Sequence, residues 1–152
     1  MKLMMNGAIT LGTEDGANVE IHKAVGDDNI IIFGLQTPEV LEMQKHGYSP
    51  LQYYNNNPEL RAALDFIGKG IGGQNFDNIY NSLKNTDRYM ALADYADYCK
   101  AQKKATELYN KPEIWNGMSL TNIAQSGIFA SDRSIDDYAK NIWNLKPVKW
   151  DK

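Results

Sequence analysis

The segment Asn29-Ile30-Ile31-Ile32-Phe33-Gly34 places the strongest constraint on how this chain folds. Its central residues are β-branched or aromatic in one continuous run, a pattern typical of a strand that is covered on both faces. It is the one convincing strand in the sequence, and a single buried strand leaves its backbone N–H and C=O groups without partners. We therefore expect either a partner strand within residues 1–20 or a sheet that continues in a larger protein.

The remainder of the sequence predicts helices. Proline follows a capping residue at Thr37-Pro38, Ser49-Pro50 and Asn57-Pro58, which predicts three helix starts, and Gly47 ends the first of these helices. Apolar spacing indicates further helices over about 87–109 and 112–126. A last helix is expected over 134–143, where Ser134 and Asp137 resemble a capping box. Near the N-terminus, short helices are expected over 3–11 and 17–24.

Length and charge narrow the class of protein. The 152 residues match one ordinary domain, and the net charge of −3 argues against a surface that binds nucleic-acid phosphates. No run of 18 apolar residues exists, so no membrane span is predicted. Cys99 is the one cysteine, which excludes an internal disulfide and suits a reducing cytoplasm.

Several local patterns suggest chemistry, and each has a structural interpretation. Gly68-x-Gly70-x-x-Gly73 matches a dinucleotide-binding fingerprint, but it follows a helix instead of a strand, so a loop is expected. His22 and His46 have no nearby ligand partner, and no metal site is predicted. The polar residues of 14–20 are expected to form a solvated turn, and Cys99 to be a small core residue. From its local sequence alone, Lys2 is an exposed lysine near the N-terminus.

The stretch from Met1 to Glu20 strongly resembles the pyridoxal-phosphate attachment segment of α-glucan phosphorylases (the glycogen, maltodextrin and starch enzymes). Further matches follow in order along nearly the whole chain. They are Ile32–Leu35, Gly47-Tyr48, Pro58–Arg61, Asp87–Tyr89, Ala93–Tyr95, Asp97-Tyr98, Asn122–Gly127, Ser131–Ile135 and Tyr138–Trp143.

The resemblance implies an α/β fold class, with this chain forming the C-terminal part of the second Rossmann-like domain of a GT-B glycosyltransferase fold. The chain itself is expected to be a single partial domain, mostly α-helical with one or two short strands. Residues 1–36 would hold the cofactor lysine and the strand, and residues 37–152 would form a helical C-terminal region. By its position in the motif, Lys2 matches the lysine that holds pyridoxal phosphate as a Schiff base. No catalytic residue is assigned.

The implied reaction is phosphorolysis, in which a terminal α-1,4-linked glucose passes to inorganic phosphate and gives glucose 1-phosphate with retained configuration. The family's glycine-rich phosphate loop, its phosphate-binding basic residues and its glucose-binding groups do not occur in this sequence. We therefore expect the chain to be inactive alone, with pyridoxal phosphate absent or weakly bound, and activity to require the missing N-terminal portion. The alternative is a helical interaction module from a split gene that complements a separate upstream chain. Exposed apolar surface would also favour self-association.

Overall fold

The structure is a computed structural model that describes residues 1–146 and 148. Its elements alternate at first between short helices and two strands and then become wholly helical. In chain order they are α1 (Lys2–Met5), β1 (Leu11–Gly12), α2 (Ala17–Val25), the 3-10 helix η1 (Asp27–Asn29), β2 (Ile31–Ile32), α3 (Thr37–His46), α4 (Pro50–Asn56), α5 (Pro58–Gly68), α6 (Asp77–Asn85), α7 (Ala91–Tyr109), α8 (Pro112–Gln125), the 3-10 helix η2 (Ser126–Phe129) and α9 (Ser131–Asn141).

The two strands form a parallel pair in which Leu11 lies opposite Ile31 and Gly12 opposite Ile32. Helix α2 makes the crossover between them, so residues 11–32 form a βαβ unit. The Ile31 N–H donates to the Thr10 carbonyl at 2.9 Å, and the Phe33 N–H donates to the Gly12 carbonyl at 3.1 Å. The prediction of a partner strand within residues 1–20 is therefore confirmed.

The helix expected over residues 3–11 is wrong beyond Met5. Gly7 adopts a φ of 80°, which a right-handed helix does not allow, and the chain turns there. Leu11 then joins the strand ladder instead of a helix. The strand expected over 29–34 is also shorter, because Asn29 completes the η1 turn by donating its N–H to the Gly26 carbonyl at 3.1 Å.

Two separate hydrophobic clusters stabilise the described part of the chain. The first joins Met4 of α1 and Ile30 to Ile21 and Val25 of the crossover helix. The second joins Leu60 and Leu64 of α5 to Leu92 of α7, with half-buried tyrosines of α4, α6 and α7 around them. Burial of such side chains is the main favourable contribution to folding, so α7 is anchored at its N-terminal end by the second cluster.

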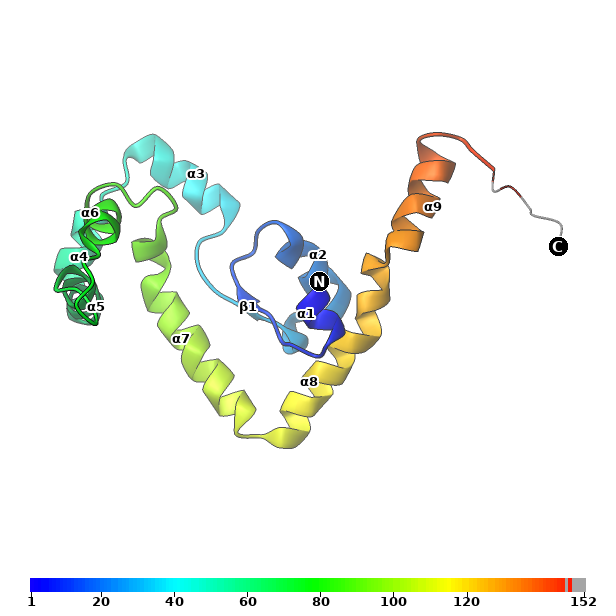
Figure 1. Cartoon of the computed structure of the whole chain (residues 1–152), viewed down its shortest axis with the longest axis horizontal. Helices are drawn as coiled ribbons and strands as arrows, with labels where there is room; N and C mark the ends of the chain where they lie inside the picture. Colours follow the sequence, from blue (N-terminus) through cyan, green and yellow to red (C-terminus); the bar gives the residue numbers. More distant parts are fainter. Residues whose placement is uncertain (147, 149–152) are drawn as a thin grey trace.

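Figure 1 shows α7 and α8 meeting as the two arms of a V, with the βαβ unit between them. Helices α4, α5 and α6 gather near the start of α7, and α9 extends beyond η2 away from the rest of the molecule. Helix α8 packs against α1, α2 and η1, whereas α9 packs against η2. Among the described residues, no helix is long and apolar enough to cross a membrane.

Three helix starts differ from the sequence predictions. Helix α3 is capped by Gln36 instead of Thr37, because Gln36 and Glu39 form a capping box with Pro38 inside the first turn. Helix α7 begins at Ala91 instead of 87, because the Asp87 side chain accepts hydrogen bonds from the first N–H groups of the helix.

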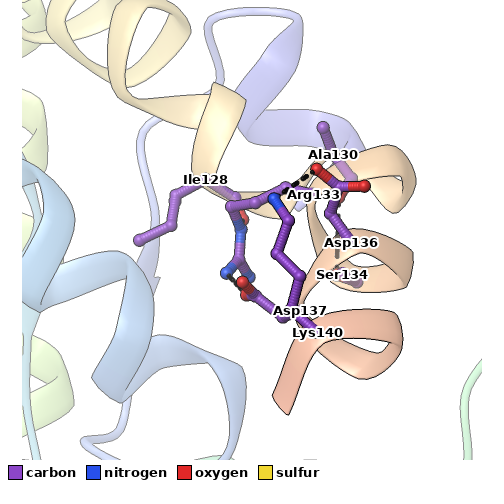
Figure 2. Close-up of polar contacts among 7 residues, drawn as sticks. All are labelled: Ile128, Ala130, Arg133, Ser134, Asp136, Asp137 and Lys140. Carbon is purple, nitrogen blue, oxygen red and sulfur yellow. Dashed lines mark hydrogen bonds and ion pairs between the residues drawn. The ribbon is translucent and has the colours of Figure 1, made fainter. Parts of the chain in front are cut away.

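Helix α9 begins at Ser131, so the capping box expected at Ser134 and Asp137 is wrong. Ser134 is a residue of the helix itself and not its cap, and its hydroxyl donates to the Ala130 carbonyl at 3.4 Å. Asp137 instead pairs with Arg133 one turn earlier, and Lys140 pairs with Asp136 at 3.0 Å, as Figure 2 shows. These exposed pairs follow the helical spacing of four residues and contribute little to stability.

The glycine-rich segment between α5 and α6 is a loop, as predicted. Ile71 and Gln74 form a single antiparallel bridge, and Gly70 and Gly72 both have positive φ. The segment follows a helix and does not open from a strand, so it lacks the geometry of a dinucleotide site.

Candidate cofactor-lysine site

Lys2 is the first residue of α1, a helix of four residues. The helix is held in place by Met4, which is 1% exposed and packs with Ile21 and Ile30. The Gly7 N–H donates to the Met4 carbonyl at 2.9 Å and closes the helix. Because one face of this short turn is buried, Lys2 remains on the exposed side of an anchored element.

The turn after α1 rests directly on α8. The Ser119 hydroxyl donates to the Gly7 carbonyl at 2.8 Å, and a Cβ on Gly7 would lie 2.4 Å from the Ser119 oxygen. Glycine is therefore required by contact as well as by its positive φ. Met4 and Gly7 together fix the position of Lys2 relative to the βαβ unit and α8.

A cavity of about 420 Å³ lies beside Lys2. Its walls are mainly apolar, with Ile9, Leu11 and Ile21 opposite the turn of α1 and two polar side chains, Thr10 and Asn18. Lys2 is the one charged side chain among the residues that line it in the described part of the chain. The cavity thus offers the Lys2 amine next to an apolar wall, with no second cationic side chain, although Met1 with its α-amine also lines it.

A larger cavity of about 770 Å³ lies at the carboxyl ends of both strands. Thr13 and Glu14 follow β1 and line one side, Phe33 and Leu35 follow β2, and α3 and α7 complete the walls. Ligands of open α/β sheets commonly bind outside the carboxyl ends of the strands. Lys2 does not line this cavity, so this larger cavity and the candidate lysine are separate features.

The connection from β2 to α3 is held by two carboxylates of α7. The Gly34 N–H donates to Asp97 at 2.9 Å, and the Leu35 N–H donates to Asp94 at 2.8 Å. Burial raises the pKa of Asp94, and the carboxylates of Asp87, Asp97 and Asp15 raise it further, while the Leu35 N–H lowers it. The Gly34 N–H instead lowers the pKa of Asp97.

The expectation of a solvated turn over residues 14–20 is wrong for two residues. Glu14 is 21% exposed in its side chain and lies 2.8 Å from the His22 ring, and Asn18 donates to the Thr13 carbonyl at 2.9 Å. His22 also lies 2.7 Å from Asp27. His22 stands eight positions after Glu14 and five positions before Asp27. No helical or strand period relates these three residues, so the sequence carried no signal for this cluster.

Cys99 and His46, the other residues considered for chemistry, lie among contacts that suit a structural role. Cys99 is half-buried and has no disulfide partner among the described residues. His46 lies in the last turn of α3, where it pairs with Glu42 at 3.2 Å. In the described ranges 1–146 and 148, no cluster of His, Cys, Asp and Glu side chains is arranged to hold a metal ion.

Comparison with known proteins places the chain in a family. Residues 1–145 match the family model of carbohydrate phosphorylases. The chain is 45% identical over 151 residues to the liver form of glycogen phosphorylase from Bos taurus and 46% identical to that from Homo sapiens, each match covering 97% of this chain. It is 44% identical over 152 residues to glycogen phosphorylase from Synechocystis sp.. The chain spans 18% of the length of these relatives. Since the family match runs over nearly every residue, the chain belongs to the carbohydrate phosphorylase family.

Proposed function

We propose that this chain is the cofactor-lysine segment and C-terminal helical region of an α-glucan phosphorylase. The complete enzyme transfers glucose from the ends of α-1,4-glucans to inorganic phosphate and releases glucose 1-phosphate. The observation that carries the proposal is the position of Lys2, which stays exposed on a turn anchored by buried Met4, beside a cavity with apolar walls. The 45% identity to glycogen phosphorylase over 151 residues supports the substrate class.

We assign Lys2 as the residue that attaches pyridoxal phosphate. A primary amine beside apolar side chains suits covalent attachment of the cofactor's aldehyde. The phosphate of the cofactor requires cations or several backbone N–H groups, and the residues lining this cavity include no charged side chain other than Lys2. When bound in the complete enzyme, the cofactor supplies a phosphate that exchanges protons near neutral pH. The residues of this chain fit the attachment end of the cofactor and not its phosphate end.

It follows that these 152 residues should bind the cofactor weakly and catalyse no phosphorolysis by themselves. The first test is to incubate the chain with pyridoxal phosphate, reduce it with borohydride and locate the label by mass spectrometry. We expect low labelling centred on Lys2, which the Lys2→Arg variant loses while labelling of the Met1 amine persists. Labelling spread evenly over all lysines would contradict the assignment of Lys2.

The second test measures glucose 1-phosphate formed from maltodextrin and inorganic phosphate. We expect no turnover above background from this chain alone. Robust turnover would disprove the proposed inactivity and would leave the family assignment intact.

The cytoplasm is the proposed location, because Cys99 is the one cysteine and it carries no disulfide.

We propose that residues 1–36 and 37–152 are two parts of a single partial domain. The hydrogen bond from Ser119 to Gly7 and the one from Leu35 to Asp94 both join the first part to the second. Separate expression of residues 1–36 and 37–152 should therefore leave both parts largely unfolded by circular dichroism. Two independently folded pieces would contradict this proposal.

A second candidate function is an interaction module that completes the enzyme when it docks on a separate upstream chain. The face of α9 favours it, because Ile135 is 57% exposed and Tyr138, one turn later, is 48% exposed. Mixing this chain with a phosphorylase portion that ends before the Lys2 motif should give a stable complex and restore activity. Self-association of this chain in sedimentation experiments, with no complex formed, would favour simple exposure of apolar surface over a docking role.

A further inference from the structure

The imidazole ring of His22 lies between two carboxylates that belong to different connections. Its Nδ1 is 2.8 Å from Oε2 of Glu14, which follows β1, and its Nε2 is 2.7 Å from Oδ1 of Asp27, which precedes β2. His22 itself lies on α2, the crossover helix. One ring therefore joins the helix to the connection before it and to the connection after it.

Only one protonation state of the ring satisfies both contacts. An ionised carboxylate accepts hydrogen bonds and donates none, so both ring nitrogens must carry a proton. A neutral imidazole has one N–H and would place a lone pair against one of the two carboxylates. The geometry of the site is that of a charged imidazolium.

We propose that His22 is a pH-dependent clamp that holds both ends of the crossover helix when protonated and releases the Asp27 end when it loses a proton. This inference concerns the βαβ unit and does not rest on the proposed function. In support, the pKa of His22 is raised. The hydrogen bond to Glu14 raises it most and the hydrogen bond to Asp27 raises it less, while burial lowers it.

Solvent exposure decides which contact opens. The side chain of Glu14 is 21% exposed, whereas that of Asp27 is 94% exposed. Water screens the Asp27 contact and hydrates its carboxylate readily, so the remaining proton stays on Nδ1 with Glu14. Release at Asp27 removes the contact between α2 and the start of η1, while the last residue of η1, Asn29, still accepts a hydrogen bond from Asn122.

The other charged groups around α2 do not replace this clamp. Helix α8 packs on α2 and carries Glu113 in its first turn as its one charged residue, and η1 adds Asp28 beside Asp27. Arg133 of α9 lines a cavity with Glu20 of α2. The remaining charges on α2 and its preceding turn are Lys23 and Asp15. Within salt-bridge distance, the described residues place only Glu14 and Asp27 beside His22.

The test is a titration of the whole chain followed by nuclear magnetic resonance of the histidine rings, from about pH 5 to about pH 9. The sequence has two histidines, so in the His46→Asn variant the only histidine ring signals are those of His22. We expect the His22 midpoint to lie above about 6.5, with the neutral ring keeping its proton on Nδ1. The amide signals of residues 27–29 should shift with the same midpoint, and those of α5 should not.

Two variants make the result decisive. Glu14→Gln should lower the midpoint most, and Asp27→Asn should lower it less and abolish the shared shift at residues 27–29. Asp27 is exposed, so its variant remains informative even if Glu14→Gln unfolds the chain. A midpoint at or below about 6.5 overturns the proposal. So does a raised midpoint with no matching change at residues 27–29, which would mean that His22 is charged but holds nothing.

Discussion

Leu35 and Asp94 are 59 residues apart in the chain, and the Leu35 N–H donates a hydrogen bond of 2.8 Å to the Asp94 carboxylate. The neighbouring Gly34 N–H donates to Asp97, which lies one turn further along α7. The backbone after β2 has no third strand beside it among the described residues. Side-chain carboxylates therefore take the place of a strand partner and attach the βαβ unit to α7.

Substitution of Gly34 by alanine should be strongly destabilising. Gly34 has a φ of 84°, and a Cβ there would lie 2.8 Å from Cγ of Asp94. Gly26 is the matched control, because its φ is 77° and a Cβ would meet nothing within 4 Å. We expect Gly26→Ala to cost about 1–3 kcal/mol from backbone strain alone, because its φ of 77° and ψ of 165° fall in a region that essentially only glycine adopts, and Gly34→Ala to cost clearly more. Urea unfolding measures both, and equal losses would refute the contact between Gly34 and Asp94.

The two carboxylates should respond to pH in opposite directions. The pKa of Asp97 is lowered, so its contribution to stability is present above about pH 3.9 and is lost as pH falls through its folded pKa. The pKa of Asp94 is raised, so its contribution is full below about pH 3.9 and is lost as pH rises through its folded pKa.

Asp97→Asn should therefore reduce the free energy of unfolding at neutral pH and weaken the acid sensitivity of the chain. Asp94→Asn should remove the cost of a buried charge at neutral pH, since its amide oxygen still accepts from Leu35. Denaturant titrations at neutral and acid pH compare the two. If both variants change stability in the same direction at neutral pH, the assigned pKa directions are wrong.

Asp87 and Tyr48 should show strong energetic coupling. Asp87 is 3% exposed and accepts from the Tyr48 hydroxyl and from the N–H groups of Ala91 and Leu92. Asp87→Ala should cost about 3 kcal/mol, because α7 loses its cap and Tyr48 loses its acceptor. Tyr48→Phe should cost about 1 kcal/mol. A double-mutant cycle by thermal unfolding should give a coupling of about 1 kcal/mol, and additive losses would show that the two residues act independently.

Asn122 should be the polar residue of α8 that is least tolerant of substitution. It is 0% exposed, and its amide donates to the Asn29 carbonyl at 2.8 Å and to the Met118 carbonyl at 3.0 Å. Its Oδ1 has no hydrogen-bond partner among the described residues. Asn122→Ala should cost about 2 kcal/mol, because the half-buried Asn29 carbonyl loses its donor.

Gln125 supplies the control for this substitution, because it lies exposed near the end of the same helix. Gln125→Ala should change stability by less than about 0.5 kcal/mol. Hydrogen exchange at Ile31 provides a second measurement, since loss of the Asn122 contact should speed exchange at β2 more than at α5. Unchanged exchange at Ile31 in Asn122→Ala would contradict a role for Asn122 in holding the βαβ unit.

Much of the helical part of the fold could be predicted from local residues. Pro50, Pro58 and Pro112 begin helices where expected, and Gly47 ends α3. The α/β class, the mostly helical chain and the phosphorylase family are likewise confirmed. Proline and glycine act through their own backbone preferences, so their effect is visible without knowledge of the rest of the molecule.

The sequence by itself predicted that the segment 29–34 contains a buried strand that needs a partner, and it placed Lys2 in a segment that resembles a cofactor-lysine motif. Only the tertiary structure decided that Leu11–Gly12 is the partner, that Asp87 caps α7, and that His22 lies between Glu14 and Asp27. The physical reason is the distance along the chain. Capping and turn preferences act within a few residues, whereas strand pairing and buried hydrogen bonds depend on groups that only the folded chain brings together.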